Sequence, residues 1–463
     1  MMRDTISQAS TLRADPLADD TIARILGPWD QNGDNAAQWQ AIATVNDQLS
    51  QWQANGALPA WRAGAGVPPA IAAALETYIQ AGLRLPDWAE PAKIARAEQL
   101  FMDMSMLSCT LLFCASLPEC YVIPDLAGVL HAAGQLEQHT DYRIRSTAAM
   151  LFPVMMHGGL TDADGGGVAQ TLKVRLIHAT IRHLILRGNP ADAARDGAPA
   201  VVAPLAAMAG ERLSMQGTLY AHGWNVERDG LPCNQEELAY TLLTFSYVFL
   251  RALRRLGLGL PADDEHAYLH AWNVVGHVLG IERGMMADTM EQAAALFASM
   301  QASGRFHPYL PDARPALGAA LMQTMEQELP LRVLKPFPVL LTRHLCGPVA
   351  SRELGLTARV SWPSRVLFAA AMGTIRLVDG TARLFCPQFS LSRLVTRVVG
   401  YQFTVKLLMD QTRPLKLPQA LLNQVGAVTA GWAEDPQAPR WVNALEARLT
   451  GRRKHTLPTG PQP

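Results

Sequence analysis

The sequence predicts an all-α protein, and three observations support that prediction. Apolar residues make up 49% of the 463 residues, which is enough to fill the interior of a large helical protein. Apolar positions recur at the spacing of a helix face along much of the chain, and prolines or acidic first turns open many of these segments. The chain shows neither alternating strand and helix patterns nor a phosphate-binding glycine loop, which excludes a nucleotide-binding α/β fold.

Helical patterns dominate the N-terminal part of the chain, after a polar and mixed stretch over 1–35. Tryptophan and aliphatic residues share one side of a predicted helix over 38–54. Prolines at the first helical position open two further helices, over 69–83 and 91–108, because proline has the helical φ and no N–H to lose. The overlapping stretch 104–117 is apolar nearly all round, which places it deep in the core.

The middle of the chain continues in the same way. Pro124 begins a helix that runs towards Leu136. Asn234 can cap a helix whose first turn is acidic, and a long apolar helix follows until the glycines and proline of 257–261 stop it. Two aspartates then open another helix over 263–280.

The C-terminal part is helical through 285–328, with a break at 304–315, and the last predicted helix covers 419–432. We predict a division into three parts, which could also form one single domain: an N-terminal helical extension over 1–95, a core over 96–300, and C-terminal helices packed on that core over 301–463.

The charge balance limits the class of partner, and the apolar runs and the cysteines indicate the compartment. Lysine plus arginine and aspartate plus glutamate both number 40, so the charge does not favour nucleic acid or an anionic membrane as a partner. The N-terminal region has no apolar signal segment, and no apolar run is long enough to span a bilayer, so we expect a soluble cytoplasmic protein. The six cysteines include no CxxC pair, which indicates reduced core thiols and no covalently attached haem.

One stretch, 141–187, stands out because two helical segments flank a glycine-rich loop. On the second segment Arg175, His178 and Arg182 share one helix face, at offsets of −3, 0 and +4. Imidazole can ligate haem iron, and guanidiniums one turn away on either side can pair with the haem propionates. A buried structural histidine between solvated arginines would give the same pattern, so both interpretations stay open on these residues alone.

The glycine-rich loop over 158–167 and a second group of histidines are weaker candidates. The loop lacks the acidic residue that a calcium site needs at its twelfth position, where Lys173 stands, so we expect a flexible surface connection that could also act as a lid. His266 and His270 form an HxxxH pair, but His277 lies about 10 Å further along the helix, too far for one ion. We find no paired Glu-x-x-His of the di-iron type, and we interpret these histidines as structural.

Three blocks of the sequence resemble the rubber oxygenase (latex-clearing protein) and MpaB-type oxygenase family, formerly a domain of unknown function. The blocks are GQLE at 134–137 followed by Arg143 and Thr147, RLIHATIR at 175–182, and GLPCNQEELAYTLLTFS at 230–246 with Tyr268, Trp272 and 276–281 downstream. Their order and spacing are similar to those of the family, and together they span roughly residues 100 to 300.

The resemblance implies a globin-like helical core that holds b-type haem and its iron, with extra helices at both ends. His178 matches the proximal iron ligand, and Arg175 and Arg182 match residues that hold the propionates. Arg143 and Thr147 match polar residues on the distal side, where they could act on dioxygen. The rubber-cleaving members of this family use dioxygen to cut a carbon–carbon double bond of polyisoprene.

The chain departs from the rubber-cleaving type on the distal side. Ser146 stands where that type has a lysine, and Asp125, Glu137 and Asp141 could each match its distal acid. That type is also exported, whereas we find no export signal. We therefore expect an oxygenase or dioxygenase that acts on a small apolar, unsaturated isoprenoid or lipid-like molecule. The alternative is a non-enzymatic haem-binding protein or helical scaffold.

Overall fold

The computed structural model confirms the predicted all-α fold. Apart from β1 (Val201–Val202) and β2 (Trp224–Asn225), which pair antiparallel, every regular element in the described part of the chain is helical. The structure describes residues 10–30, 35–132, 147, 150–195, 197–205, 214–304, 312–327, 329 and 332–385.

The helices of the first half lead up to α10, which carries the predicted iron ligand. Their bounds are α2 (Pro16–Leu26), α3 (Ala36–Leu49), η1 (Asn55–Ala57), α4 (Pro69–Gly82), α5 (Pro91–Asp103), α6 (Ser105–Leu111), η2 (Leu112–Ser116), α7 (Leu117–Cys120), α8 (Pro124–Ala132) and α10 (Gly167–Leu186). The helices of the second half are α11 (Pro190–Ala193), α12 (Met215–Ala221), α13 (Val226–Asp229), α14 (Gln235–Phe245), α15 (Tyr247–Arg255), α16 (Ala262–Val278), η3 (Arg283–Met285), α17 (Met290–Ser303), α18 (Arg314–Gln327), α19 (Phe337–Cys346), α20 (Pro348–Glu353) and α21 (Trp362–Phe385).

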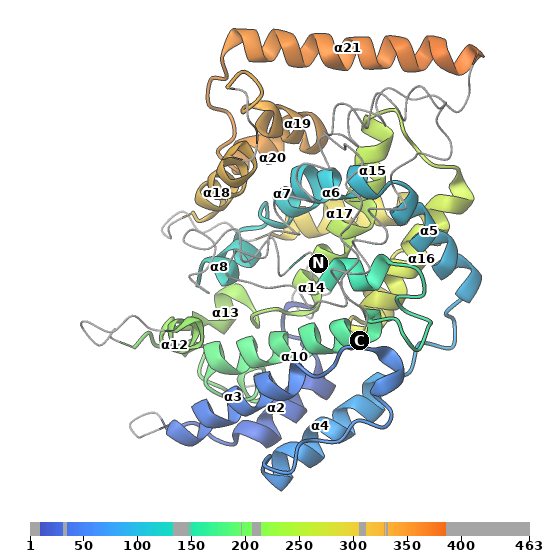
Figure 1. Cartoon of the computed structure of the whole chain (residues 1–463). Helices are drawn as coiled ribbons and strands as arrows, with labels where there is room; N and C mark the ends of the chain where they lie inside the picture. The colour runs from blue at the N-terminus through green and yellow to red at the C-terminus, as the bar shows by residue number, and fades with distance from the viewer. Residues whose placement is uncertain are drawn as a thin grey trace, which may run out of the picture.

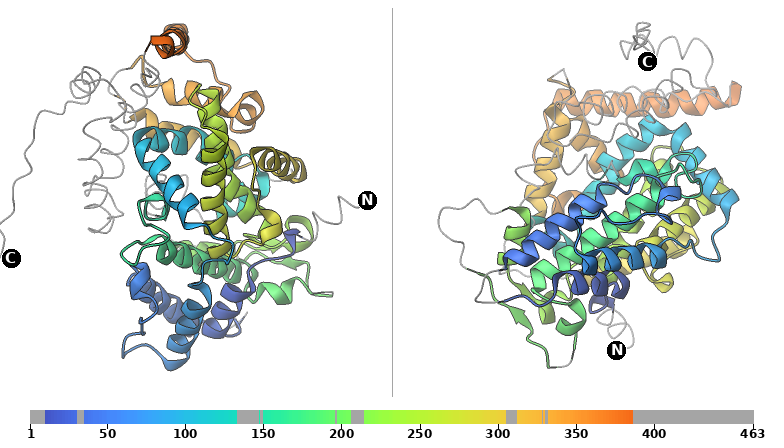
Figure 2. Two further views of the ribbon diagram at one scale, coloured as in Figure 1. Left: turned by 90° about the vertical axis from the view of Figure 1, so that its right-hand side faces the viewer. Right: turned by 60° about the horizontal axis from the view of Figure 1, so that its bottom comes forward.

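Helix α10 lies across the lower half of the molecule, with α2, α3 and α4 beneath it in the view of Figure 1. It packs against α2, α12 and α16, while α2 packs against α4, and α16 against α5. Figure 2 shows the same arrangement from two further sides, with the N-terminal helices along one face of α10. The helix that carries the candidate site is therefore covered by segments that precede it and segments that follow it in the sequence.

Helix α2 is an element that the sequence analysis missed. Pro16 opens it after an extended Asp15, and Ile22, Ile25 and Leu26 are buried. The apolar face covers only three turns, and polar residues precede and follow it, so the helical pattern is weak in the sequence. This short helix and the residue before it nevertheless hold both arginines of the candidate site.

The apolar stretch 104–117 is interrupted by a π turn, η2, because of the proline that follows it. Pro118 has no N–H to donate to the carbonyl of Cys114, so the regular ladder cannot continue there. The thiol of Cys346 donates instead to the carbonyls of Cys114 and Ala115, at 3.6 and 3.7 Å. The five cysteines among the described residues are all buried, as expected for core thiols.

Other helices also end at different residues than the sequence predicted. The helix predicted over 91–108 ends at Asp103, and the long helix predicted after Asn234 is divided at Ser246 into α14 and α15. The hydroxyl of Ser246 donates to the carbonyl of Leu242 at 2.9 Å, a local bond that competes with the helix ladder. The helix predicted over 419–432 lies outside the described residues.

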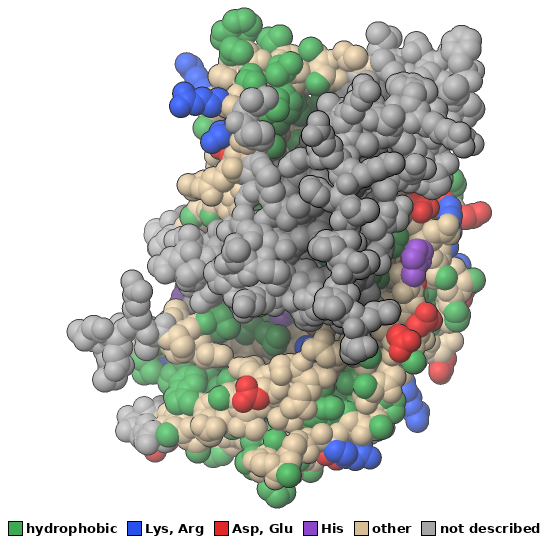
Figure 3. Space-filling model, in the orientation of Figure 1, with side chains coloured by type: hydrophobic (Ala, Val, Ile, Leu, Met, Phe, Trp, Pro, Cys, Tyr) green, Lys and Arg blue, Asp and Glu red, His purple; other side chains and the backbone are tan. Residues whose placement is uncertain are grey.

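The described chain includes no single helix that combines the length and the apolar content needed to cross a bilayer. Helix α5 and the run Leu107–Cys120, bent by 89° relative to each other, meet those criteria only when taken together. Exposed apolar side chains do gather over the start of α21, at the upper left of Figure 3, where Trp362, Val366 and Leu367 lie.

Candidate functional site

The glycine-rich loop before α10 is fixed in place, whereas the sequence predicted a flexible connection. The Oδ1 atom of Asn55 accepts the backbone N–H groups of Val168 and Ala169 at 3.0 and 3.2 Å, so η1 caps α10 from outside the helix. The Nδ2 group of the same side chain donates to the carbonyls of Gly159 and Asp162 at 2.8 and 3.0 Å. One asparagine therefore joins both ends of the loop and sets where α10 begins.

A buried carboxyl holds the other side of the same loop. Glu98 on α5 accepts the backbone N–H groups of Gly158 and Leu160 at 2.8 and 3.3 Å. Burial raises the pKa of Glu98 to about 7, and the backbone hydrogen bonds oppose that rise. The start of the helix that carries His178 is thus tied to α5 as well as to η1.

His178 lies half-buried on α10, at the border between two faces of the helix. One face, which includes Leu172, Leu176 and Ala179, is fully buried in the core. The other face is a partly exposed apolar stripe, formed by Val174, Ile177 and Ile181, on which Ile177 is 41% exposed. An imidazole at this border combines a nitrogen donor with an apolar surface beside it.

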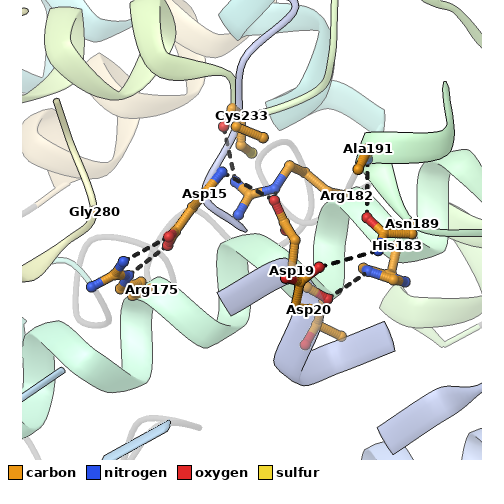
Figure 4. Close-up of polar contacts among 12 residues, drawn as sticks. Asp15, Asp19, Asp20, Arg175, Arg182, His183, Asn189, Ala191, Cys233 and Gly280 are labelled. Atoms are coloured by element: carbon orange, nitrogen blue, oxygen red, sulfur yellow. Dashed lines mark hydrogen bonds and ion pairs between the residues drawn. The ribbon is translucent and has the colours of Figure 1, made fainter. Parts of the chain in front are cut away.

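Arg175 is paired within the chain. Its Nε and Nη2 donate to the two carboxylate oxygens of Asp15 at 2.5 and 2.6 Å (Figure 4). Its Nη1 donates to the carbonyl of Val278 at 3.1 Å. This is a bidentate pair with both side chains largely removed from water. The arginine predicted to hold a propionate therefore already has one carboxylate partner.

Arg182 is fully buried and has a different set of partners. Its Nε donates to Asp19 at 2.7 Å and its Nη1 to the carbonyl of Cys233 at 2.9 Å (Figure 4). Its Nη2 is buried without a hydrogen-bond partner among the residues that the structure describes. Burial raises the pKa of Asp19 to about 6, although the charge of Arg182 opposes the rise.

The distal residues are only partly within the described chain. Thr147 is helical and half-buried. Arg143 and Ser146 lie outside the described residues, as do the side chains of the three acids considered for the distal position, Asp125, Glu137 and Asp141. The roles of Arg143 and Thr147 stay predictions.

The histidines of α16 have structural partners. The Nε2 atom of His270 accepts the backbone N–H of Glu90 at 2.9 Å, and Trp88 packs edge-on against the rings of His270 and His277. Glu265 on the same helix is buried and paired with Arg254. Across the described residues, no group of three or more His, Cys, Asp or Glu side chains is placed to hold a metal ion.

Asp15 and Asp19 are site residues that the sequence did not predict. Their only local signal is the usual one of acids at the start of a helix that opens with Pro16. Their partners Arg175 and Arg182 lie 160 and 163 residues away, and no local pattern reports a contact across that separation.

Comparisons with known proteins agree with this fold. A sequence model of the family described as "ER-bound oxygenase mpaB/B'/Rubber oxygenase, catalytic domain" matches residues 122–377. A rubber oxygenase of Streptomyces sp. (strain K30) is 22% identical over 356 residues, which cover 73% of this chain and 75% of that protein. The structure of latex clearing protein LCP in the closed state matches with a TM-score of 0.57 at 18% identity, covering 91% of this chain and 90% of that one.

Proposed function

Because the chain belongs to the family of MpaB-type and rubber oxygenases, we propose that it is a haem-dependent oxygenase acting on an apolar, unsaturated substrate. The observation that carries this proposal is the position of His178 on α10, beside an apolar stripe and between two buried arginines. Haem iron, when bound, supplies the centre at which dioxygen is activated for attack on a carbon–carbon double bond.

The residues present fit such a group. The donor set near His178 is one imidazole and two guanidiniums, which suits a ligand with an apolar body, one metal centre and carboxylate edges. The Nη2 of Arg182 is a buried donor that no described residue satisfies, and a carboxylate oxygen would satisfy it. Arg175 keeps N–H groups on Nη1 and Nη2 beyond those bonded to Asp15 and Val278.

We assign each of these residues one task. His178 ligates the iron, and Arg175 and Arg182 fix the propionates. Arg143 and Thr147 would donate hydrogen bonds to dioxygen. The apolar stripe of α10, with Ile177 on it, binds the hydrocarbon and excludes water from the reacting bond.

For the substrate we propose a small isoprenoid or unsaturated lipid chain, met in the cytoplasm. The Streptomyces relative is named for rubber, but at 22% identity its substrate does not have to be shared. Ser146 supports a different substrate, because a short neutral side chain cannot place a positive charge in the distal pocket as a lysine would.

A non-enzymatic role is the second candidate, and the ion pairs favour it. Asp15 and Asp19 already neutralise the two arginines, so neither arginine is left as an unpaired buried charge when no ligand is bound. A scaffold of this family would keep those pairs and bind no haem.

The visible spectrum of the purified protein separates the two candidates. We expect a Soret band and one haem per chain, and oxygen uptake with short isoprenoids or unsaturated fatty acids that exceeds uptake with polyisoprene latex. Haem without oxygen uptake on any of these would favour a haem-binding protein. A protein that takes up no haem on reconstitution would refute the proposal.

A further inference from the structure

We propose that Asp15 and Asp19 are positioning residues of the haem site, which hold Arg175 and Arg182 in the orientation that a propionate needs. This inference rests on the function proposed above. It also assigns a role to residues 10–19, which we call the N-terminal strap, although they lie outside the matched family region of 122–377.

The strap is fastened to the body of the protein by backbone bonds. The carbonyl of Thr11 accepts the N–H of Leu231 at 2.8 Å, and the carbonyl of Arg13 accepts the N–H of Gln235 at 2.9 Å. The side-chain amide of Gln235 donates to the carbonyls of Ala14 and Gly280, at 2.7 and 2.9 Å. The strap is thus fixed just before the first aspartate.

Position 280 leaves no room for a side chain beside the pair of Asp15 and Arg175. Gly280 has a φ of +90°, and a Cβ atom there would lie 2.6 Å from the Oδ2 of Asp15 and 2.8 Å from the Nε of Arg175. The side chains of the pair are only 3% and 11% exposed. The bidentate geometry fixes the plane of the Arg175 guanidinium, so the direction of its remaining N–H groups is fixed too.

Asp19 links the strap to the second arginine. Its Oδ1 accepts the Nε of Arg182 at 2.7 Å, and its Oδ2 accepts the backbone N–H of Asp15 at 3.0 Å. With Nη1 bonded to the carbonyl of Cys233, the guanidinium is held at two of its three nitrogens. The third, Nη2, is the buried donor without a described partner. The strap therefore leaves one defined donor position on Arg182.

Stability alone is a weak reason for this arrangement. Buried ion pairs contribute little net stability, because removing two charges from water offsets their attraction, and apolar residues of similar size often do as well. Two such pairs on one helix, one turn to either side of a half-buried histidine, are better explained by the orientation that they impose on the guanidiniums.

The test compares Asp15→Asn and Asp19→Asn with the control Asp20→Asn. Asp20 lies on the same helix and is exposed, so the control makes the same charge change without touching either arginine. An asparagine keeps the shape but loses the charge and one acceptor oxygen. We expect each strap variant to lose haem to apomyoglobin about tenfold faster than the control, with an unchanged Soret band.

A purely structural role is distinguished by two further measurements. In an Arg182→Ala background, Asp19→Asn should add little to the rate of haem loss, because it acts through that arginine. The urea midpoints of the haem-free variants report stability separately. If Asp15→Asn does not fold, Asp19→Asn carries the test alone.

Equal haem-loss rates in all three variants would overturn the inference while leaving the proposed function intact. An additive effect of Asp19→Asn and Arg182→Ala would overturn it as well. Failure of the unmodified protein to bind haem would instead overturn the proposed function, and the inference with it.

Discussion

Helices α10 and α16 both carry histidines among apolar residues, but the groups that surround these histidines differ between the two helices. On α16, the ring nitrogen of His270 accepts a backbone N–H from Glu90, and a tryptophan packs against the ring. On α10, His178 lies between two buried arginines, each paired with an aspartate of the N-terminal strap. The groups around a histidine, and not its spacing along a helix, therefore distinguish a structural histidine from a candidate metal ligand.

The largest expected effect is that of replacing His178, and its absence would contradict this comparison. His178→Ala should abolish haem incorporation with the helical circular dichroism preserved, because it removes the proposed iron ligand. His270→Ala should keep the haem and lower the free energy of unfolding by about 1–3 kcal/mol, since the N–H of Glu90 loses its acceptor. The exposed His266 serves as the control. Stoichiometric haem in His178→Ala would show that the iron ligand lies elsewhere.

The second prediction concerns the arginines. Arg182→Ala should lower the free energy of unfolding of the haem-free protein by about 3–5 kcal/mol, because Asp19 is left buried without its charge partner. Arg96, which pairs with Asp264 between α5 and α16, is 43% exposed in its side chain. Arg96→Ala should therefore cost less than about 1 kcal/mol. Urea unfolding measures the free energy of unfolding of both variants. Equal losses would mean that Arg182 does not neutralise a buried Asp19.

The third prediction separates the two sides of the proposed haem. Thr147→Ala and Arg143→Ala should keep the haem content of the unmodified protein but lower oxygen turnover on the order of 100-fold, because each would remove a hydrogen-bond donor to dioxygen. Haem content is measured alongside turnover. Loss of haem in either variant would make that residue structural.

The fourth prediction compares how the two helices begin. Helix α16 opens with its own acids, Asp263, Asp264 and Glu265, whereas α10 depends on Asn55 from a distant segment. Asn55→Ala should lower the free energy of unfolding by about 2 kcal/mol, since two N–H groups and two carbonyls lose their partner. An exposed control on a neighbouring helix is Asn46→Ala. A loss no greater than that of the control would contradict the cap.

The sequence predicted the elements that depend on local patterns. Helices opened by proline or by acids, such as α4 and α16, were predicted within a few residues. Helical spacing alone also predicted that one helix face carries Arg175, His178 and Arg182. What could not be predicted depends on contacts across the fold. The partners of the two arginines lie in, and immediately before, a short helix with a weak pattern. The cap of α10 comes from Asn55, more than 100 residues away.

The smallest expected effect is a change in pH dependence, and it concerns the loop that starts α10. Burial raises the pKa of Glu98 from 4.5 to about 7, so between these values the folded protein keeps a proton that the unfolded chain has released. The stability that Glu98 contributes is therefore fully present below about pH 4.5 and is lost as the pH rises through about 7. Asp19 acts in the same direction over the lower part of this range, since burial raises its pKa to about 6.

Glu98→Gln should flatten this fall without abolishing it. Glutamine does not titrate, so only the part due to Asp19 and other groups remains, while one of the N–H groups of Gly158 and Leu160 loses its acceptor. The variant should thus be less stable than the unmodified protein at pH 5, with the difference shrinking towards pH 8. Thermal unfolding across this range measures it, with the exposed Glu227→Gln as control. Parallel curves for the unmodified protein and Glu98→Gln would mean that Glu98 is ionised throughout, and that α5 holds the loop before α10 with a permanent charge.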